Sequence, residues 1–173
     1  MSTPRLTEIT EKQYLDSFSA RADRGELFQF IVTSTDGSFD TGAPIKILYI
    51  TGAKRVKLRR TACFFGGNAT IQVYKAPTVT ANGDAVTVYN QDNSSDKVPL
   101  VKVYTSPTTD ANGTICFPEC VTLGSSTLPS RAVSSTSERT NRTLDANTKY
   151  LVVLTAGSDN MTAVYNTEFF EVK

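Results

Sequence analysis

Hydrophobic and polar residues alternate along most of the chain from Glu26 onward. Alternation with a period of two is typical of β-strands, whose successive side chains point to opposite faces of a sheet. It predicts strands over 26–33, 45–51, 55–65, 69–75, 85–90, 98–105, 114–122, 148–156 and 161–172, separated by turn residues such as Asn-Gly pairs. Most of these strands start about 10–16 residues apart, too close for intervening helices. We therefore expect an all-β domain over 26–173, an antiparallel β-sandwich of jelly-roll or Greek-key topology.

The first 25 residues follow a helical pattern instead. A capping box begins at Thr10, Leu15, Phe18 and Ala22 recur at helical spacing, and Gly25 is a terminator. This predicts a short helix over about 11–23, within an N-terminal helical arm over 1–25. The helix either packs against its own domain or docks on a neighbouring molecule, and the pattern favours neither.

An internal repeat and one long polar connection complete the organisation of the chain. Residues 73–83 match residues 103–113 at an offset of 30, with seven of eleven positions identical. Each copy contains a proline, which interrupts strand pairing, followed by Asn-Gly, which suits a tight turn. We expect two equivalent hairpins. Residues 124–147 are rich in Ser, Thr, Arg and Asn, which predicts a long binding loop or flap.

Composition excludes several classes of function. The chain has 18 basic and 17 acidic residues, so it lacks the basic excess of a nucleic-acid binder. It has no apolar run long enough to span a membrane, and its charged N-terminal residues argue against a signal peptide. Histidine is absent, which removes the usual catalytic triads and imidazole metal sites. We expect a protein that is not an enzyme and needs no cofactor or metal.

Three cysteines and one aspartate-rich turn are the remaining candidates for chemistry. Cys116 and Cys120 are too far apart on an extended strand to form a disulfide unless Pro118 bends the chain, so reduced, buried thiols are the simpler interpretation. The segment 36–40 spaces its oxygens like a calcium loop, but it lacks the later glycine and glutamate of that motif. A simple turn is favoured there.

The most distinctive charge pattern lies in the predicted strand 55–65. Arg55, Lys57 and Arg59 should share one face, with Val56 and Leu58 on the core side. The basic face is either a solvated outer surface, which also protects against aggregation, or a contact with an acidic partner surface.

Three groups of strands and turns then suggest a family. They are 56–60 with 71–74, the segment from Ala81 to Ser95 with Val103-Tyr104 and the second Asn-Gly turn, and the closing pair 147–155 and 170–173. Together they make the stretch from Ile47 to Lys173 resemble head-decoration, or cement, proteins of tailed bacteriophages, which have a jelly-roll-like β-sandwich. The N-terminal helix and the cysteines around Pro118 are not part of the resemblance.

The resemblance implies a virion structural protein, made in the host bacterial cytoplasm and bound to the outer surface of the phage head. Its implied partners are the major capsid protein and further copies of itself, as a dimer or trimer. We expect the arm, the basic strand face and the polar connection to supply the contacts. The candidate contact residues are Leu15, Phe18, Arg21, Arg55, Lys57, Arg59, Arg131 and Arg139. A tail or fibre module that binds a receptor or carbohydrate is the alternative function.

Overall fold

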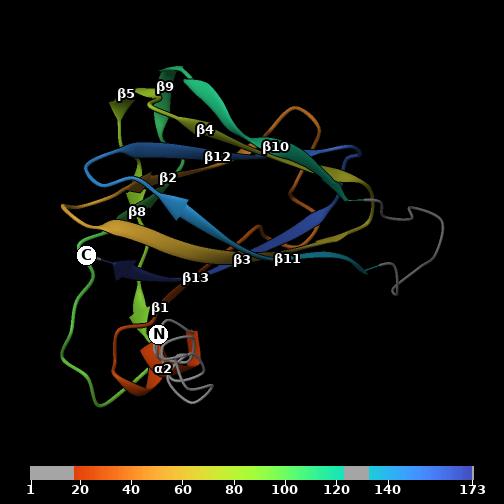
Figure 1. The fold of residues 1–173 in the computed structure, drawn as a ribbon. Coiled ribbons are helices and arrows are strands. Elements are labelled where there is room, and N and C mark those ends of the chain that lie inside the picture. Colours follow the sequence, from red (N-terminus) through yellow and green to blue (C-terminus); the bar gives the residue numbers. More distant parts are fainter. Residues whose placement is uncertain (1–17, 123–132, 173) are drawn as a thin grey trace, which may run out of the picture.

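The computed structural model describes residues 18–122 and 133–172, of which 118–120, 122 and 133–141 are described by their backbone alone. Within these residues two antiparallel sheets pack face to face, with a short helix below the first sheet in the view of Figure 1, so the predicted all-β sandwich is confirmed. The first sheet has the order β11-β3-β13-β1-β7 and the second has the order β10-β4-β12-β2-β8-β6. The elements are α2 (Phe18–Asp23), β1 (Phe28–Thr33), β2 (Ile45–Ile50), β3 (Arg55–Phe65), β4 (Ala69–Lys75), β5 (Thr78–Ala81), β6 (Asp84–Ala85), β7 (Tyr89–Asn90), β8 (Lys102–Thr105), β9 (Thr108–Ala111), β10 (Thr114–Thr122), β11 (Val133–Leu144), β12 (Lys149–Ala156) and β13 (Thr162–Val172).

The connections between the long strands follow a jelly roll. The chain alternates between the sheets through β1, β2, β3 and β4, continues with β10 beside β4, and alternates again through β11, β12 and β13. Four long strands therefore lie in each layer, as in a double Greek key. The segment 76–113 is inserted between β4 and β10. Its strands β7 and β8 pair with β1 and β2, so the insertion extends the same side of both sheets.

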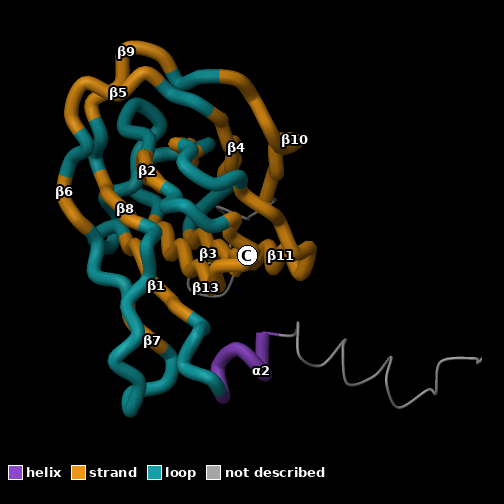
Figure 2. The backbone as a smooth tube through the Cα atoms, turned by 60° about the vertical axis from the view of Figure 1, so that its left-hand side comes forward, coloured by secondary structure: helices purple, strands orange, loops and turns teal. Residues whose placement is uncertain are grey.

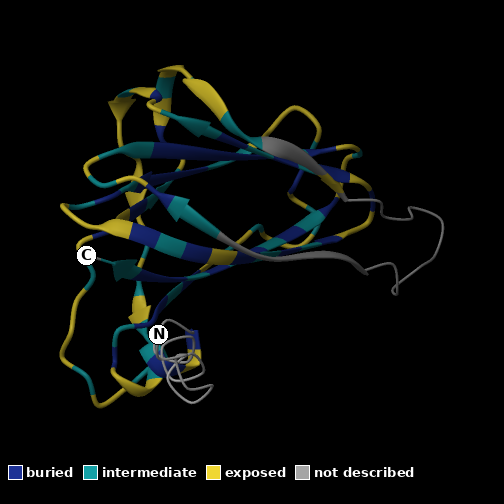
Figure 3. Cartoon of the chain, viewed as in Figure 1, coloured by how far each residue is buried: buried dark blue, intermediate teal, exposed yellow. Residues whose placement is uncertain are grey.

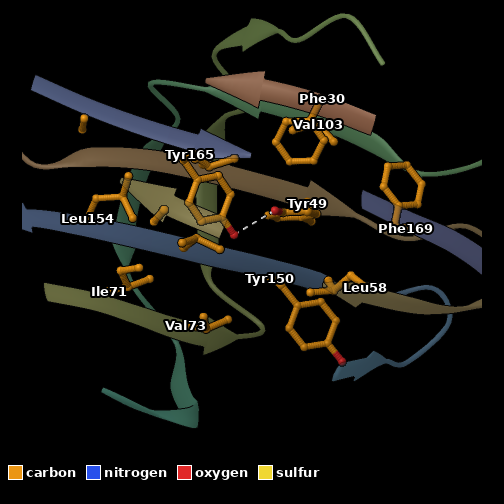
Figure 4. Close-up of a cluster of buried hydrophobic side chains, with 14 of the residues drawn as sticks. Phe30, Tyr49, Leu58, Ile71, Val73, Val103, Tyr150, Leu154, Tyr165 and Phe169 are labelled. Carbon is orange, nitrogen blue, oxygen red and sulfur yellow. Dashed lines mark hydrogen bonds between the residues drawn. The ribbon is translucent and has the colours of Figure 1, made fainter. Parts of the chain in front are cut away.

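The core lies between the inner faces of the two sheets, where large apolar side chains alternate with outward-facing polar ones. Phe30, Phe64, Ile71 and Leu154 are at most 1% exposed. Figure 4 shows how rings and aliphatic side chains from both layers meet there. The buried hydroxyl of Tyr49 lies 3.1 Å from that of Tyr165, which satisfies both groups. Burial away from water raises the pKa of Tyr49 well above its ordinary value.

Helix α2 covers one end of the outer face of the first sheet (Figures 1 and 2). Phe18 packs on Phe170 with ring centroids 5.0 Å apart, edge to face, in a small cluster that includes Leu27. The helix ends at Asp23, and the predicted terminator Gly25 follows it with a φ of +61° and donates its N–H to the carbonyl oxygen of Ala22. Residues 11–17 of the predicted helix lie outside the described residues.

A two-stranded ribbon, β5 with β9, lies over the outer face of the second sheet (Figure 1). Leu48 and Leu151 are opposite each other in β2 and β12 and are fully buried, although they point away from the sandwich core. The amino group of Lys46 in β2 donates to the hydroxyl of Thr109 in β9 at 3.0 Å, which places the ribbon over this face. The strand β12 is therefore apolar on both faces because both are covered within the chain.

The repeat does not form two separate hairpins, as the sequence suggested. β5 of the first copy pairs with β9 of the second copy. The strand after each Asn-Gly turn then pairs with the strand that opens the other copy, so that Asp84 lies opposite Thr105 and Thr114 lies opposite Lys75. The strands of each copy thus pair with strands of the other copy. A strand pairs with whichever neighbour its turn leads to, and sequence spacing does not reveal that neighbour.

Three further expectations need correction. The predicted strand 85–90 is split between β6 and β7, which belong to different sheets. The predicted strand 98–105 begins only at Lys102, after Pro99, which has no N–H to donate to a ladder. The connection 124–147 is not structureless, since its residues 133–144 form β11 and pair with β3. β11 was missed because its Ser- and Thr-rich sequence lacks apolar alternation, although threonine favours strands.

Candidate functional site

The basic residues of β3 point where the alternation predicted. Arg55 and Arg59 are exposed and Lys57 is half-buried, while Val56 and Leu58 are buried in the core. These basic side chains lie on the outer face of the first sheet, where Arg59 contacts Phe18 of α2.

Two of the three basic residues contact partners within the chain. Arg59 forms an ion pair with Glu168 of β13, and its guanidinium carbon lies 4.4 Å from the ring centroid of Phe18. The amino group of Lys57 lies 6.0 Å from the centroid of Phe170. Cations over aromatic faces are attracted by the ring quadrupole. This part of the basic face therefore helps to hold α2 on the sheet.

The described part of the predicted arm is packed against its own domain. Phe18 is 7% exposed, so its side chain contacts the sheet and not the surroundings. Arg21 lies over the ring of Phe170 at 5.1 Å and pairs with Glu26 at 2.5 Å. Of the two alternatives for the helix, packing against its own domain or docking on a neighbouring molecule, residues 18–23 show the first.

The structure says little about the other predicted contact residues, Leu15, Arg131 and Arg139. Leu15 and Arg131 lie outside the described residues. Arg139 lies in β11, where only the backbone is described.

A groove of about 530 Å³ opens where α2, the start of β1, the end of β13 and the loop before β8 meet. It is lined by Arg21, Glu26, Phe28, Lys54, Lys97, Val98 and Glu171. Phe28 is 5% exposed and belongs to the core, while Val98 is 81% exposed on the loop. The groove thus combines charged groups with apolar surface.

Both carboxylates of the groove already have partners. Glu26 accepts hydrogen bonds from Arg21 and, at 3.2 Å, from the amino group of Lys97. These cations, Arg21 first, hold the pKa of Glu26 below its ordinary value. Glu171 accepts the backbone N–H groups of Leu100 and Val101 at 2.6 and 3.1 Å. The acids therefore fix the walls of the groove.

The outer face of the first sheet continues beyond α2 and carries exposed apolar side chains. Ile31 of β1 is 52% exposed, Phe65 of β3 is 40% exposed and Tyr89 of β7 is 65% exposed. They lie opposite Asn166, Thr162 and Gln29 in the pairing register. Figure 3 shows the mixture of exposed and half-buried positions on this layer.

Cys116 is partly buried in the fold, and the aspartates of the segment 36–40 form hydrogen bonds with neighbouring residues. Cys116 is a free, half-buried thiol, and burial raises its pKa. In the segment 36–40 the carboxylate of Asp36 accepts from Thr162, and that of Asp40 accepts from the N–H of Asn160. These bonds join the turn to the β12–β13 connection.

Among residues 18–122 and 133–172, no group of three or more Cys, Asp or Glu side chains is arranged to hold a metal ion. No helix in this part of the chain is long and apolar enough to cross a membrane.

Arg60 lies on the core face of β3 together with Val56 and Leu58, a position that was not predicted for it. It is only 5% exposed on the inner face of β3 and lines a small cavity of about 10 Å³ with Tyr49, Arg142 and Tyr165. Its neighbour Arg59 points to the opposite face because side chains alternate along a strand. A run of two arginines therefore contributes one surface charge and one buried charge.

Comparison with known proteins finds no matching family model and no matching curated protein. Among solved structures, one similar chain comes from a marine algae virus of the order Picornavirales, with 12% identity and a TM-score of 0.26, covering 100% of this chain and 86% of that one. Another is the VP2 subviral particle of infectious bursal disease virus, with 10% identity and a TM-score of 0.19, covering 85% of this chain and 42% of that one. Likenesses at this level carry no argument about function.

Several residues of the groove were not predicted as functional. Lys54, Lys97, Val98 and Glu171 come from three separate segments, so no local motif joins them. The one local signal was the valine at position 98, an apolar residue between Lys97 and Pro99 at the start of the predicted strand 98–105.

Proposed function

We propose that this chain is a virion structural protein that decorates the outer surface of a phage head and stabilises contacts between neighbouring major capsid subunits. The strand and turn pattern that resembles cement proteins supports this function. The jelly-roll body agrees with the fold that the resemblance implies. The proposed partners are the major capsid protein and further copies of the chain, as a dimer or trimer.

The observation that carries the proposal is the outer face of the first sheet. α2 covers one end of it, and the part beyond presents Ile31, Phe65 and Tyr89 to the surroundings. Exposed aromatic and aliphatic side chains on a sheet face suit contact with another protein. Each contact is modest, but many copies on a lattice raise the overall avidity.

The first test is the copy number of this chain in purified virions, measured by quantitative mass spectrometry relative to the major capsid protein. Decoration of the head predicts one copy per capsid subunit or a simple fraction of that number. A few to a few dozen copies would instead indicate a tail or fibre component, which is the alternative function. Absence from the particle would refute the structural role.

A second test asks whether the sheet face makes the contact. Heads that lack this chain are mixed with the wild-type protein or with the variant Ile31→Asp, and binding is measured by co-sedimentation. The variant is expected to bind more weakly, because a buried, unpaired carboxylate is costly at an interface. The matched control is Ile115→Asp in β10, which is 60% exposed on the other sheet. Equal loss in both variants would show that this face is not the contact.

A further inference from the structure

We propose that the groove between α2 and the loop before β8 binds an acidic peptide segment that also carries an apolar side chain. The identity of the protein that supplies this segment rests on the proposed function, under which it is the major capsid protein. The chemistry of the peptide is inferred from the groove alone.

The charge of the groove favours an acidic occupant. Three cations, Arg21, Lys54 and Lys97, line it together with two carboxylates. Glu26 is already paired with Arg21 and Lys97, and Glu171 is occupied by two backbone N–H groups. Within the described part of the chain, Lys54 has no ion-pair partner. A carboxylate of an incoming peptide would complement this surplus positive charge.

The apolar groups of the groove favour a peptide over a small anion. Val98 presents most of its side chain to solvent at one wall, and Phe28 lies at the base where the groove meets the core. A volume of about 530 Å³ falls in the range of ligand-binding clefts, roughly 300–1,000 Å³. An apolar side chain that contacts Val98 would remove this exposed surface from water.

The groove is also held in shape before any ligand arrives. The amide of Asn90 in β7 donates to the carbonyl oxygen of Gly25 at 2.9 Å, and the hydroxyl of Ser95 in the loop before β8 donates to the same oxygen at 3.3 Å, which ties β7 and the loop to the residues after α2. Lys97 donates to the carbonyl oxygen of Arg24 at 2.8 Å, and Glu171 fixes Leu100 from the other side. Walls that are ordered in the free protein reduce the entropic cost of binding.

The test uses the full-length chain and an array of overlapping short peptides that covers every structural protein of the virion. The affinities of bound peptides are then measured by fluorescence anisotropy for the wild type and for Lys54→Glu. We expect the bound peptides to be acidic with at least one apolar residue. The variant should bind them about 5- to 10-fold more weakly, because attraction at one site becomes repulsion.

Two further variants serve as controls, and circular dichroism checks that all of them are folded. Lys102→Glu makes the same charge change at an exposed lysine of β8, on the outer face of the other sheet, and should leave the affinity unchanged. Val98→Asp should weaken binding at least as much as Lys54→Glu. Binding of basic and acidic peptides alike, or equal effects of Lys54→Glu and Lys102→Glu, would overturn the proposal.

The array also separates this inference from the proposed function. Acidic peptides of the major capsid protein that respond to Lys54→Glu would support both. Responsive peptides from another virion protein would support the groove and refute the head-decoration role. A chain shortened by residues 1–17 that binds more than tenfold tighter would show that the chain's own N-terminal segment competes for the groove. That result would overturn the assignment to a partner.

Discussion

Replacing Phe18 by alanine tests whether one side chain holds α2 on the sandwich. Phe18 is 7% exposed, packs edge to face on Phe170 and lies under the guanidinium of Arg59. Loss of its burial is worth about 1.5–3 kcal/mol. The aromatic pair adds about 0.5–1.5 kcal/mol and the cation–π contact about 0.5–1 kcal/mol. Because the helix lies at the edge of the core and can relax, we expect a loss of about 2–3 kcal/mol in the free energy of unfolding.

The assay is urea denaturation followed by circular dichroism, together with a thermal scan. The expected loss corresponds to a decrease in Tm of roughly 4–12 °C for a domain of this size. The matched control is Phe65→Ala, the same change at a 40%-exposed phenylalanine on the same sheet face, which should cost under about 1 kcal/mol. If both variants lose the same stability, or Phe18→Ala loses less than about 0.5 kcal/mol, then packing of Phe18 does not hold the helix.

Three other predictions concern the pairing between the two repeat copies, the ribbon over the second sheet and the residues that follow α2. Gly113→Ala should cost at least about 1–2 kcal/mol, because its φ is +92° and a Cβ would lie 2.3 Å from a backbone oxygen, whereas Gly42→Ala, with open space around it, should be neutral in the same denaturation assay. Leu151→Ala should cost about 2–5 kcal/mol and leave a cavity between the second sheet and the ribbon, which a crystal structure of the variant would show. Glu26 has a lowered pKa in the folded chain, so its ion pairs stabilise the fold above its ordinary pKa of 4.5 and are lost as the pH falls through the folded value. Glu26→Gln should therefore lose less stability than the wild type between about pH 6 and pH 3 in urea titrations.

The strands of the sandwich were predictable where apolar and polar side chains alternate, as in β3 and β13. Alternation failed for β11. This strand has almost no apolar residues, yet its backbone pairs with β3 on both sides of an irregularity between Glu138 and Arg142. It also failed in the insertion, where β6 and β7 are two residues long and join different sheets.

The candidate site was predictable only in part, because it depends on which segments meet. Alternation correctly placed Arg59 and Leu58 on opposite faces of the strand. It did not indicate that α2 would place Phe18 beneath that arginine. Lys54, Val98 and Glu171 are far apart in the chain and line one groove only after β13 ends beside the loop that precedes β8.

By itself, the sequence determined the period of the strands, the glycine that ends the helix and the turns at Asn-Gly, because these depend on local backbone preferences. The tertiary structure decided what covers the outer face of each sheet and which strand each strand of the repeat pairs with. It placed the ribbon over the face of the second sheet that carries Leu151, and the helix over Phe170 of β13, so these outward-facing apolar residues are covered within the chain. Burial is a property of neighbours in space, and the order of residues does not record which segment supplies them.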